Sequence, residues 1–199
     1  MIMARQSKKI KNTCSPRWAS FCGWCLEKLG WEGIGGAMPC KKGVVIGVPH
    51  TSIWDFLICY LFYCKSGTLA HIMVKKEFFF WPLAPILRAL GAVPVDRESP
   101  SASVRSIIRT MNECDTFHLA LSPEGTRKPV SRWKTGFHMI AQETGADVYL
   151  GYFDWGTKRV SVGEKFEMSD NARADMDRIQ AIYEKMGLVG KHKNGYITH

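Results

Sequence analysis

The sequence predicts an α/β fold, a mostly parallel mixed sheet flanked by helices, with an amphipathic helix at the N-terminal end. Two observations support this class. Short, β-branched apolar runs alternate along the chain with longer segments whose apolar residues recur at helical spacing. Such alternation is typical of strands joined by helical crossovers, which produce a parallel sheet. A hairpin turn at Trp155–Thr157 then predicts an antiparallel strand at one edge.

The length and composition fit one domain preceded by an arm. The chain has 199 residues, of which 46% are hydrophobic, enough for a real core. We divide it into a basic arm with an amphipathic helix, residues 1–42, and a main domain, residues 43–199. The net charge of +9 suits anionic partners: membrane surfaces, phosphorylated substrates, acidic carrier proteins or nucleic acid. Nucleic acid is the weakest of these, because no basic stripe is interleaved with aromatic residues.

The first expected helix runs from Arg17 to Leu29. Ser15-Pro16 supplies a cap and a proline at the first helical position. One apolar stripe follows, formed by Trp18, Phe21, Cys22, Cys25, Leu26 and Leu29. A stripe of this kind packs on a core or lies in a membrane interface, and the sequence favours neither.

No apolar run reaches the roughly 18 residues that span a bilayer. No clean apolar segment follows the basic start, so we expect no secretory signal. The seven cysteines are scattered, which favours a reducing compartment. We therefore expect a cytoplasmic protein, peripheral at the inner face of the cytoplasmic membrane.

The segment 43–63 organises the rest of the chain. Val44–Val48 reads as a buried strand and Ile53–Tyr63 as a buried helix. Between them stand His50 and Asp55, separated by four residues. A five-residue step on one regular helix would turn the side chains apart, so His50 must precede the helix and Asp55 must lie in its first turn. There the carboxylate can hold one ring nitrogen and leave the other as a base.

A structural interpretation of the same residues exists. Ser52-Ile53-Trp54-Asp55 fits a capping box, with serine at the cap and an acid three residues later. Asp55 would then serve the helix start, and His50 would be a strand-end histidine bonded to the backbone.

The remaining elements continue the alternation. The expected strands cover 69–74, 91–95, 117–121, 147–153 and 159–162, and the expected helices cover 99–113, 135–144 and 170–186. The segment 78–90 is also expected to be helical, with a short or broken start because of Pro82 and Pro85. His50, Arg97 and the loop Glu124–Arg127 each follow a strand directly. Because the carboxyl ends of parallel strands share one edge, where ligands bind, we expect these three segments at one rim. Their convergence favours the catalytic interpretation of His50.

These residues resemble the glycerolipid acyltransferases, of which 1-acylglycerol-3-phosphate acyltransferase is the type. The first block of that family matches His50 and Asp55, the second matches Gly91–Arg97, and the third matches Pro123–Arg127. Order and spacing agree from about Gly43 to Leu150. Three blocks in register are far more specific than the His/Asp pair alone.

Two positions depart from the family pattern. The usual proline of a fourth block is missing from Asp147–Gly151, and Ser122 replaces an apolar or aromatic residue before Pro123. The fourth block helps to shape the substrate pocket, so its absence bears on the acceptor more than on the reaction.

The resemblance implies a mechanism. His50 deprotonates an acceptor hydroxyl, which attacks the thioester of acyl-CoA or acyl-carrier protein, while Asp55 orients His50. Backbone N–H groups at the helix start hold the oxyanion. The expected acceptor is 1-acylglycerol-3-phosphate, which would give phosphatidate.

The resemblance also implies a phosphate site. Arg97 and Arg127 bind the acceptor phosphate, and Thr126 bonds to it. Glu124 orients Arg127 or the loop backbone, and Gly125 permits close approach. No metal or organic cofactor is expected, and the expected partners are the lysophospholipid, the acyl donor and a membrane surface.

Three alternatives stay open at this point. In the first, the acceptor is another lysolipid, such as an amino-acid lipid. In the second, a metal held by His50, Asp55 and Glu124 performs hydrolysis. In the third, the chain is a non-catalytic lipid-binding module.

Overall fold

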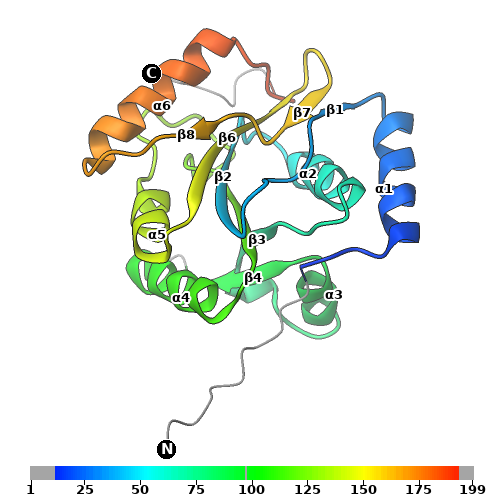
Figure 1. Cartoon of the computed structure of the whole chain (residues 1–199), viewed down its shortest axis with the longest axis horizontal. Coiled ribbons are helices and arrows are strands. Elements are labelled where there is room, and N and C mark those ends of the chain that lie inside the picture. Colours follow the sequence, from blue (N-terminus) through cyan, green and yellow to red (C-terminus); the bar gives the residue numbers. More distant parts are fainter. Residues whose placement is uncertain (1–11, 97, 193–199) are drawn as a thin grey trace, which may run out of the picture.

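The computed structural model describes residues 12–96 and 98–192 (Figure 1). An eight-stranded sheet has the order β1-β7-β6-β2-β5-β3-β4, and β8 pairs with β6 outside this path. The strands are β1 (Glu32–Ile34), β2 (Lys42–Val48), β3 (His71–Lys75), β4 (Ala92–Val95), β5 (Phe117–Leu121), β6 (Asp147–Asp154), β7 (Arg159–Ser161) and β8 (Lys165–Phe166).

The centre of the sheet is parallel and its end is mixed. β2 pairs in parallel with β5 on one side and β6 on the other, and β3 continues in parallel between β5 and β4. The turn after Asp154 sends β7 back antiparallel to β6. The predicted fold class and the antiparallel strand after the turn are confirmed, but β7 is not at the edge, because β1 pairs with it on the outer side. β1 and β8 were not expected, since both are too short for a hydrophobic pattern.

Helices cover both faces of the sheet. They are α1 (Pro16–Lys28), α2 (Trp54–Lys65), α3 (Leu83–Ala89), α4 (Pro100–Glu113), α5 (Gly136–Thr144) and α6 (Ala172–Met186), with a short 3-10 turn at Lys76–Phe78. Figure 1 shows α4, α5 and α6 on one side of the sheet and α1 and α2 on the other. The segment 78–90, for which a short or broken helix start was expected from its two prolines, is helical only from Leu83, directly after Pro82.

The side chains of β2 alternate between two apolar cores, as the period of a strand requires. Val44 and Ile46 join the core beneath α4, α5 and α6, whereas Val45 joins the core beneath α1 and α2. Tyr183 of α6 places its hydroxyl 3.0 Å from the carbonyl oxygen of Ile46 and 2.8 Å from that of Gly151. Burial on both faces holds the end of β2, which carries His50, in a fixed place.

The apolar stripe of α1 is divided between the core and the surface. Ser15 caps the helix by accepting the N–H of Trp18, as predicted. Cys22 and Leu26 are fully buried against α2, while Trp18 and Phe21 are about half exposed. The stripe thus packs on the core through some of its residues and leaves others at the surface, and its contact with a membrane stays a prediction.

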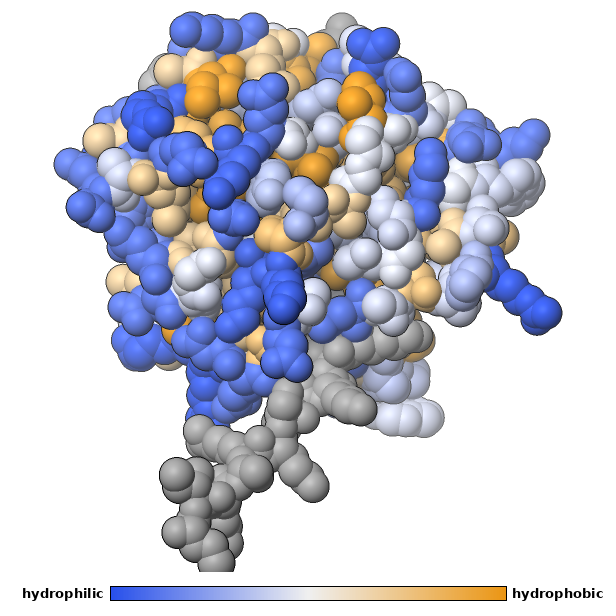
Figure 2. All heavy atoms as spheres, in the orientation of Figure 1, coloured by the Kyte–Doolittle hydropathy of each residue, from blue (hydrophilic) through white to orange (hydrophobic). Residues whose placement is uncertain are grey.

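The molecular surface differs between regions. In Figure 2, the left of the view, where Figure 1 places α4, α5 and α6, is covered mainly by hydrophilic side chains, with hydrophobic ones in small separate areas. In the part of the chain that the structure describes, no helix is long and apolar enough to cross a membrane.

Candidate active site

Three adjacent strands bring the site together. β6, β2 and β5 are parallel neighbours, so their carboxyl ends lie at one edge of the sheet. β2 leads into His50, β5 leads into the loop that contains Glu124, and β6 leads into Trp155. The rim expected from the sequence is therefore present for the segments of β2 and β5.

His50 and Asp55 meet in the predicted way. His50 precedes α2 and Asp55 lies in its first turn. The imidazole Nδ1 is 3.4 Å from Asp55 Oδ2, and the side chain of Asp55 is 1% exposed while that of His50 is 31% exposed. A buried acid thus faces one ring nitrogen of a histidine that a reactant can reach.

Asp55 also serves the start of α2. Its Oδ2 accepts the backbone N–H groups of Thr51 at 2.8 Å and Ser52 at 2.7 Å. Ser52 Oγ accepts the N–H of Trp54 at 3.3 Å, which completes a capping arrangement. The catalytic and structural interpretations of Asp55 are therefore compatible. The N–H groups of Thr51 and Ser52 donate to this carboxylate, and an oxyanion site at the helix start stays a prediction.

Sequence reasoning missed Trp155. Its indole N–H donates to Asp55 Oδ1 at 2.7 Å, so each oxygen of the Asp55 carboxylate accepts a hydrogen bond. Trp155 directly follows β6, and a position next to a strand end is the signal that could have found it, as it found His50 and Glu124. The sequence predicts a turn at Trp155 and does not show that β6 lies beside β2.

Glu124 binds the loop that carries His50. Its Oε2 accepts the backbone N–H of His50 at 2.7 Å and the hydroxyl of Ser122 at 2.9 Å. This contact fits the expectation that Glu124 orients loop backbone, but the backbone belongs to the His50 loop. Glu124 is 5% exposed, and burial raises the pKa of its carboxyl to about 7, although the two hydrogen bonds oppose the shift.

The loop after Glu124 turns sharply and exposes basic side chains. Gly125 has a φ of +65°, which favours glycine, and a side chain there would meet Lys134. Thr126 Oγ1 accepts the backbone N–H of Lys128 at 3.2 Å. A polar hollow of about 490 Å³ lies beside this loop and is lined by Thr51, Ser52, Ile53, Thr126, Arg127, Lys128 and His192. His192 was not expected there, because it belongs to a polar terminal segment.

Arg97 lies outside the described residues, so its place at the rim stays a prediction. β4, which precedes it, is separated from β2 by β5 and β3. Its neighbour Asp96 forms an ion pair of 2.6 Å with Lys76.

Within residues 12–96 and 98–192, no group of three or more His, Cys, Asp or Glu side chains could hold a metal ion. The carboxylates of Asp55 and Glu124 instead receive N–H and O–H donors.

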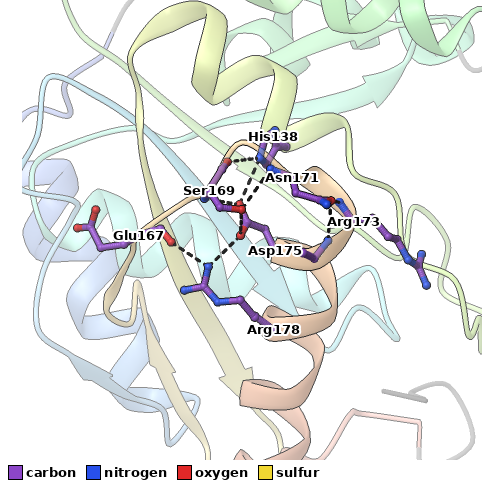
Figure 3. Close-up of polar contacts among 8 residues, drawn as sticks. His138, Glu167, Ser169, Asn171, Arg173, Asp175 and Arg178 are labelled. Atoms are coloured by element: carbon purple, nitrogen blue, oxygen red, sulfur yellow. Dashed lines mark hydrogen bonds and ion pairs between the residues drawn. The ribbon is translucent and has the colours of Figure 1, made fainter.

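A second His/Asp pair lies on the other side of the sheet. His138 Nε2 of α5 is 3.2 Å from Asp175 Oδ2 of α6, and the two side chains are 4% and 0% exposed. Figure 3 shows Ser169 and Arg178 bound to the same carboxylate. Because no reactant can reach this pair, it is not a catalytic site. Its contacts join α5 to α6.

The comparisons with known proteins identify the family of the chain. The model of the acyltransferase family matches residues 34–150, which include His50, Asp55 and the loop Pro123–Arg127. The chain belongs to the acyltransferase family. It is an enzyme of that family, with the fold predicted from the resemblance to glycerolipid acyltransferases. No curated protein matches the chain significantly in sequence.

One solved structure shows how far the fold extends. The chain is similar to the crystal structure of the 1-acyl-sn-glycerophosphate (LPA) acyltransferase PlsC from Thermotoga maritima, with a TM-score of 0.56 and 17% identity. The match covers 86% of this chain and 79% of that one. At this identity the similarity shows the fold alone. The similar part of the chain extends beyond residues 34–150, which the family model matches.

Proposed function

We propose that this acyltransferase moves a fatty acyl group from an acyl thioester to the hydroxyl of a lysophospholipid, and that 1-acylglycerol-3-phosphate is its preferred acceptor. The observation that carries the proposal is an accessible His50 held by the buried Asp55 beside a polar hollow lined by Arg127 and Lys128. The PlsC from Thermotoga maritima, an LPA acyltransferase with a similar fold, supports the same choice.

The proposed chemistry needs one base. Asp55 holds Nδ1 of His50, so the other ring nitrogen takes the proton of the acceptor hydroxyl. The hydroxyl oxygen forms a bond to the thioester carbonyl carbon, and the carbon–sulfur bond breaks as the tetrahedral intermediate collapses. The departing thiolate takes the proton from the imidazolium. The products are an ester and a free thiol, and no covalent enzyme intermediate is required.

The polar hollow suits an anionic group on the acceptor. Arg127 offers a planar fork of donors that matches a phosphate, and Lys128 adds a second cation. Thr126 and the start of α2 line the same space, and a helix start favours negative charge. Coenzyme A and acyl-carrier protein both present a phosphopantetheine thioester, so either is a candidate donor.

An acceptor with a lipid tail is best met at a membrane surface. Exposed aromatic side chains are frequent on α1 and in the segment before α3, where Trp24 is 53% and Trp81 is 86% exposed. An apolar hollow of about 510 Å³ lies between α1 and α2. Together with the net charge of +9, these features favour binding to an anionic bilayer. In a cell this surface would be the inner face of the cytoplasmic membrane.

Vesicle sedimentation tests the membrane part. We expect the wild type to bind phosphatidylglycerol vesicles, and the double variant Trp24→Ala/Trp81→Ala to bind them less tightly. Met139→Ala is the matched control, because Met139 is 54% exposed but lies on α5. Equal binding of all three proteins, or no binding at low salt, would reject the membrane proposal.

Acyl transfer by the purified protein tests the reaction. Long-chain acyl-CoA and acyl-carrier protein are supplied in detergent micelles with a panel of lysolipids, beside the variant His50→Ala. Formation of phosphatidate that disappears in His50→Ala, with the variant still folded by circular dichroism, supports the proposal. Transfer only to phosphate-free lysolipids would support the mechanism and reject the proposed acceptor. We include these lysolipids because Asp147–Gly151 lacks the proline of the fourth family block. Activity that survives in His50→Ala would reject the role of His50.

A further inference from the structure

Trp155 is held firmly where β6 ends. Its backbone N–H donates to the carbonyl oxygen of Val189 at 2.8 Å. Its ring packs edge-on against Trp31 at a centroid distance of 4.9 Å. The ammonium groups of Lys158 and Lys191 lie 4.6 and 4.7 Å from its ring centroid. The orientation of the indole is therefore set by several elements independently of Asp55.

The indole N–H and His50 contact different oxygens of the Asp55 carboxylate. The indole N–H donates to Asp55 Oδ1 at 2.7 Å, while Oδ2 of the same carboxylate lies 3.4 Å from His50 Nδ1. Asp55 is 1% exposed, so this donor satisfies a carboxylate oxygen that is shielded from bulk water. Without it, one buried carboxylate oxygen would be left without its side-chain donor.

We propose that Trp155 is a positioning residue for acyl transfer, and that its indole N–H fixes the Asp55 carboxylate in the plane that orients His50. This inference rests on the proposed function for its catalytic readout. Trp155 does not touch the reacting atoms and acts through Asp55.

The C-terminal segment 189–192 joins this arrangement to the His50 loop. Val189 N–H donates to Asp154 Oδ1 at 2.9 Å, and the N–H of His192 donates to Thr51 Oγ1 at 3.4 Å. Gly190 packs on Thr51 so closely that an added Cβ would lie 2.6 Å from its methyl group. The segment thus fastens the end of β6 and the residue after His50 to each other.

Other ionisable groups near the pair set the background for its pH dependence. Glu124 binds the His50 backbone from the loop after β5, and Cys59 of α2 interacts with the charge of Asp55. Lys158 and Lys191 lie over Trp155. Further basic groups line the polar hollow: Arg127, Lys128 and His192. A change from tryptophan to phenylalanine at position 155 leaves all of these in place.

The loss of the indole donor has two consequences. The N–H groups of Thr51 and Ser52 still hold Asp55 Oδ2, but Oδ1 loses its donor and the carboxylate can tilt about Oδ2, so the imidazole of His50 is oriented less well and kcat falls. The carboxylate also keeps more negative charge, which stabilises the imidazolium, so the acidic limb of the kcat–pH profile moves to higher pH. KM for both substrates stays unchanged, because Trp155 does not line the polar hollow.

The test compares Trp155→Phe with Trp54→Phe. Both changes keep an aromatic ring next to Lys191 and remove an indole N–H, but the indole of Trp54 is half exposed on the first turn of α2. In Trp155→Phe we expect kcat to fall about 10- to 100-fold with KM unchanged and the acidic limb displaced. Trp54→Phe retains the wild-type kcat and profile. A wild-type kcat and kcat–pH profile in Trp155→Phe would overturn the proposal. A loss of activity that is fully explained by a smaller fraction of folded protein would overturn it too.

A spectroscopic measurement separates this inference from the proposed function. The indole ¹H–¹⁵N resonance of Trp155 is assigned as the one lost in Trp155→Phe. In the wild type we expect it to titrate together with the His50 imidazole, and in His50→Ala this titration is lost. If the wild type acylates no lysolipid, the proposed function fails and this resonance alone decides the positioning role. A resonance that responds neither to pH nor to Asp55→Asn would overturn it.

Discussion

Asp55 Oδ2 lies 3.4 Å from His50 Nδ1 and also accepts the backbone N–H groups of Thr51 and Ser52. One carboxylate oxygen therefore faces the base and fixes the loop between the two residues. The five-residue step of the sequence makes this possible, because it places Asp55 in the first helical turn and His50 ahead of it.

Replacement of Asp55 by asparagine should separate these two tasks. The amide oxygen can still accept one or both backbone N–H groups, but it carries no charge to stabilise an imidazolium. We expect kcat to fall by about 10²- to 10⁴-fold with little change in KM. Steady-state acyl transfer measures this. The exposed Asp115, changed in the same way, should leave kcat unaltered, and an active Asp55→Asn would contradict the assigned role.

Replacement of Arg127 by glutamine should affect the acceptor alone. Arg127 is exposed at the polar hollow, and the loss of its paired donors should raise KM for a phosphate-bearing lysolipid by about 10- to 100-fold. KM for a phosphate-free lysolipid should not change. Arg132→Gln, at an exposed arginine of the same region that does not line the hollow, is the control. Equal effects on both acceptors would show that Arg127 does not bind the phosphate.

The sequence predicted the local part of the site and missed the part that depends on strand order. The meeting of His50 and Asp55 follows from five residues and one helix start. The contacts of Glu124 with the His50 backbone and of Trp155 with Asp55 need β5 and β6 on either side of β2. Hydrophobic patterns identify strands, but they do not tell which strands are neighbours.

The stripe of α1 shows the same limit. Cys22 and Trp18 belong to one helical face by their spacing, yet Cys22 is 0% and Trp18 is 44% exposed. The position of α2 decides this difference, since it covers only part of the face. Periodicity gave the direction of the stripe, and only packing shows how much of it reaches the surface.

Glu124 should make stability depend on pH. Burial raises the pKa of its carboxyl from 4.5 to about 7. A carboxyl whose pKa is raised in the folded state makes its full contribution to the stability of the fold below pH 4.5. That contribution is lost as the pH rises to about 7. Urea unfolding should show the wild type losing about 3 kcal/mol relative to Glu124→Gln over this range.

The exposed Glu143 is the matched control for this measurement. Glu143→Gln should retain the pH dependence of the wild type. If Glu124→Gln retains it too, the carboxyl of Glu124 is ionised in the folded protein throughout, and its burial does not control the titration.

Asp175 should be important for stability but not for activity. It is fully buried and binds Ser169, His138 and Arg178 (Figure 3). Burial acts to raise the pKa of its carboxyl, but the hydrogen bonds of Ser169 and Arg178 outweigh burial and hold that pKa below 3.8. Asp175→Asn should lower the unfolding free energy by about 3 kcal/mol.

The pH dependence of this loss has a definite sign. A carboxyl with a lowered pKa stabilises the fold above its ordinary pKa, and the contribution disappears as the pH falls through its folded value. The difference in stability between the wild type and Asp175→Asn should therefore shrink below pH 3.8. Asp177→Asn, at an exposed aspartate on the same helix, should cost less than about 1 kcal/mol. Because α5 and α6 cover the face opposite α2, folded Asp175→Asn should keep the wild-type kcat, and a specific loss of kcat would mean that this second His/Asp pair is coupled to the site.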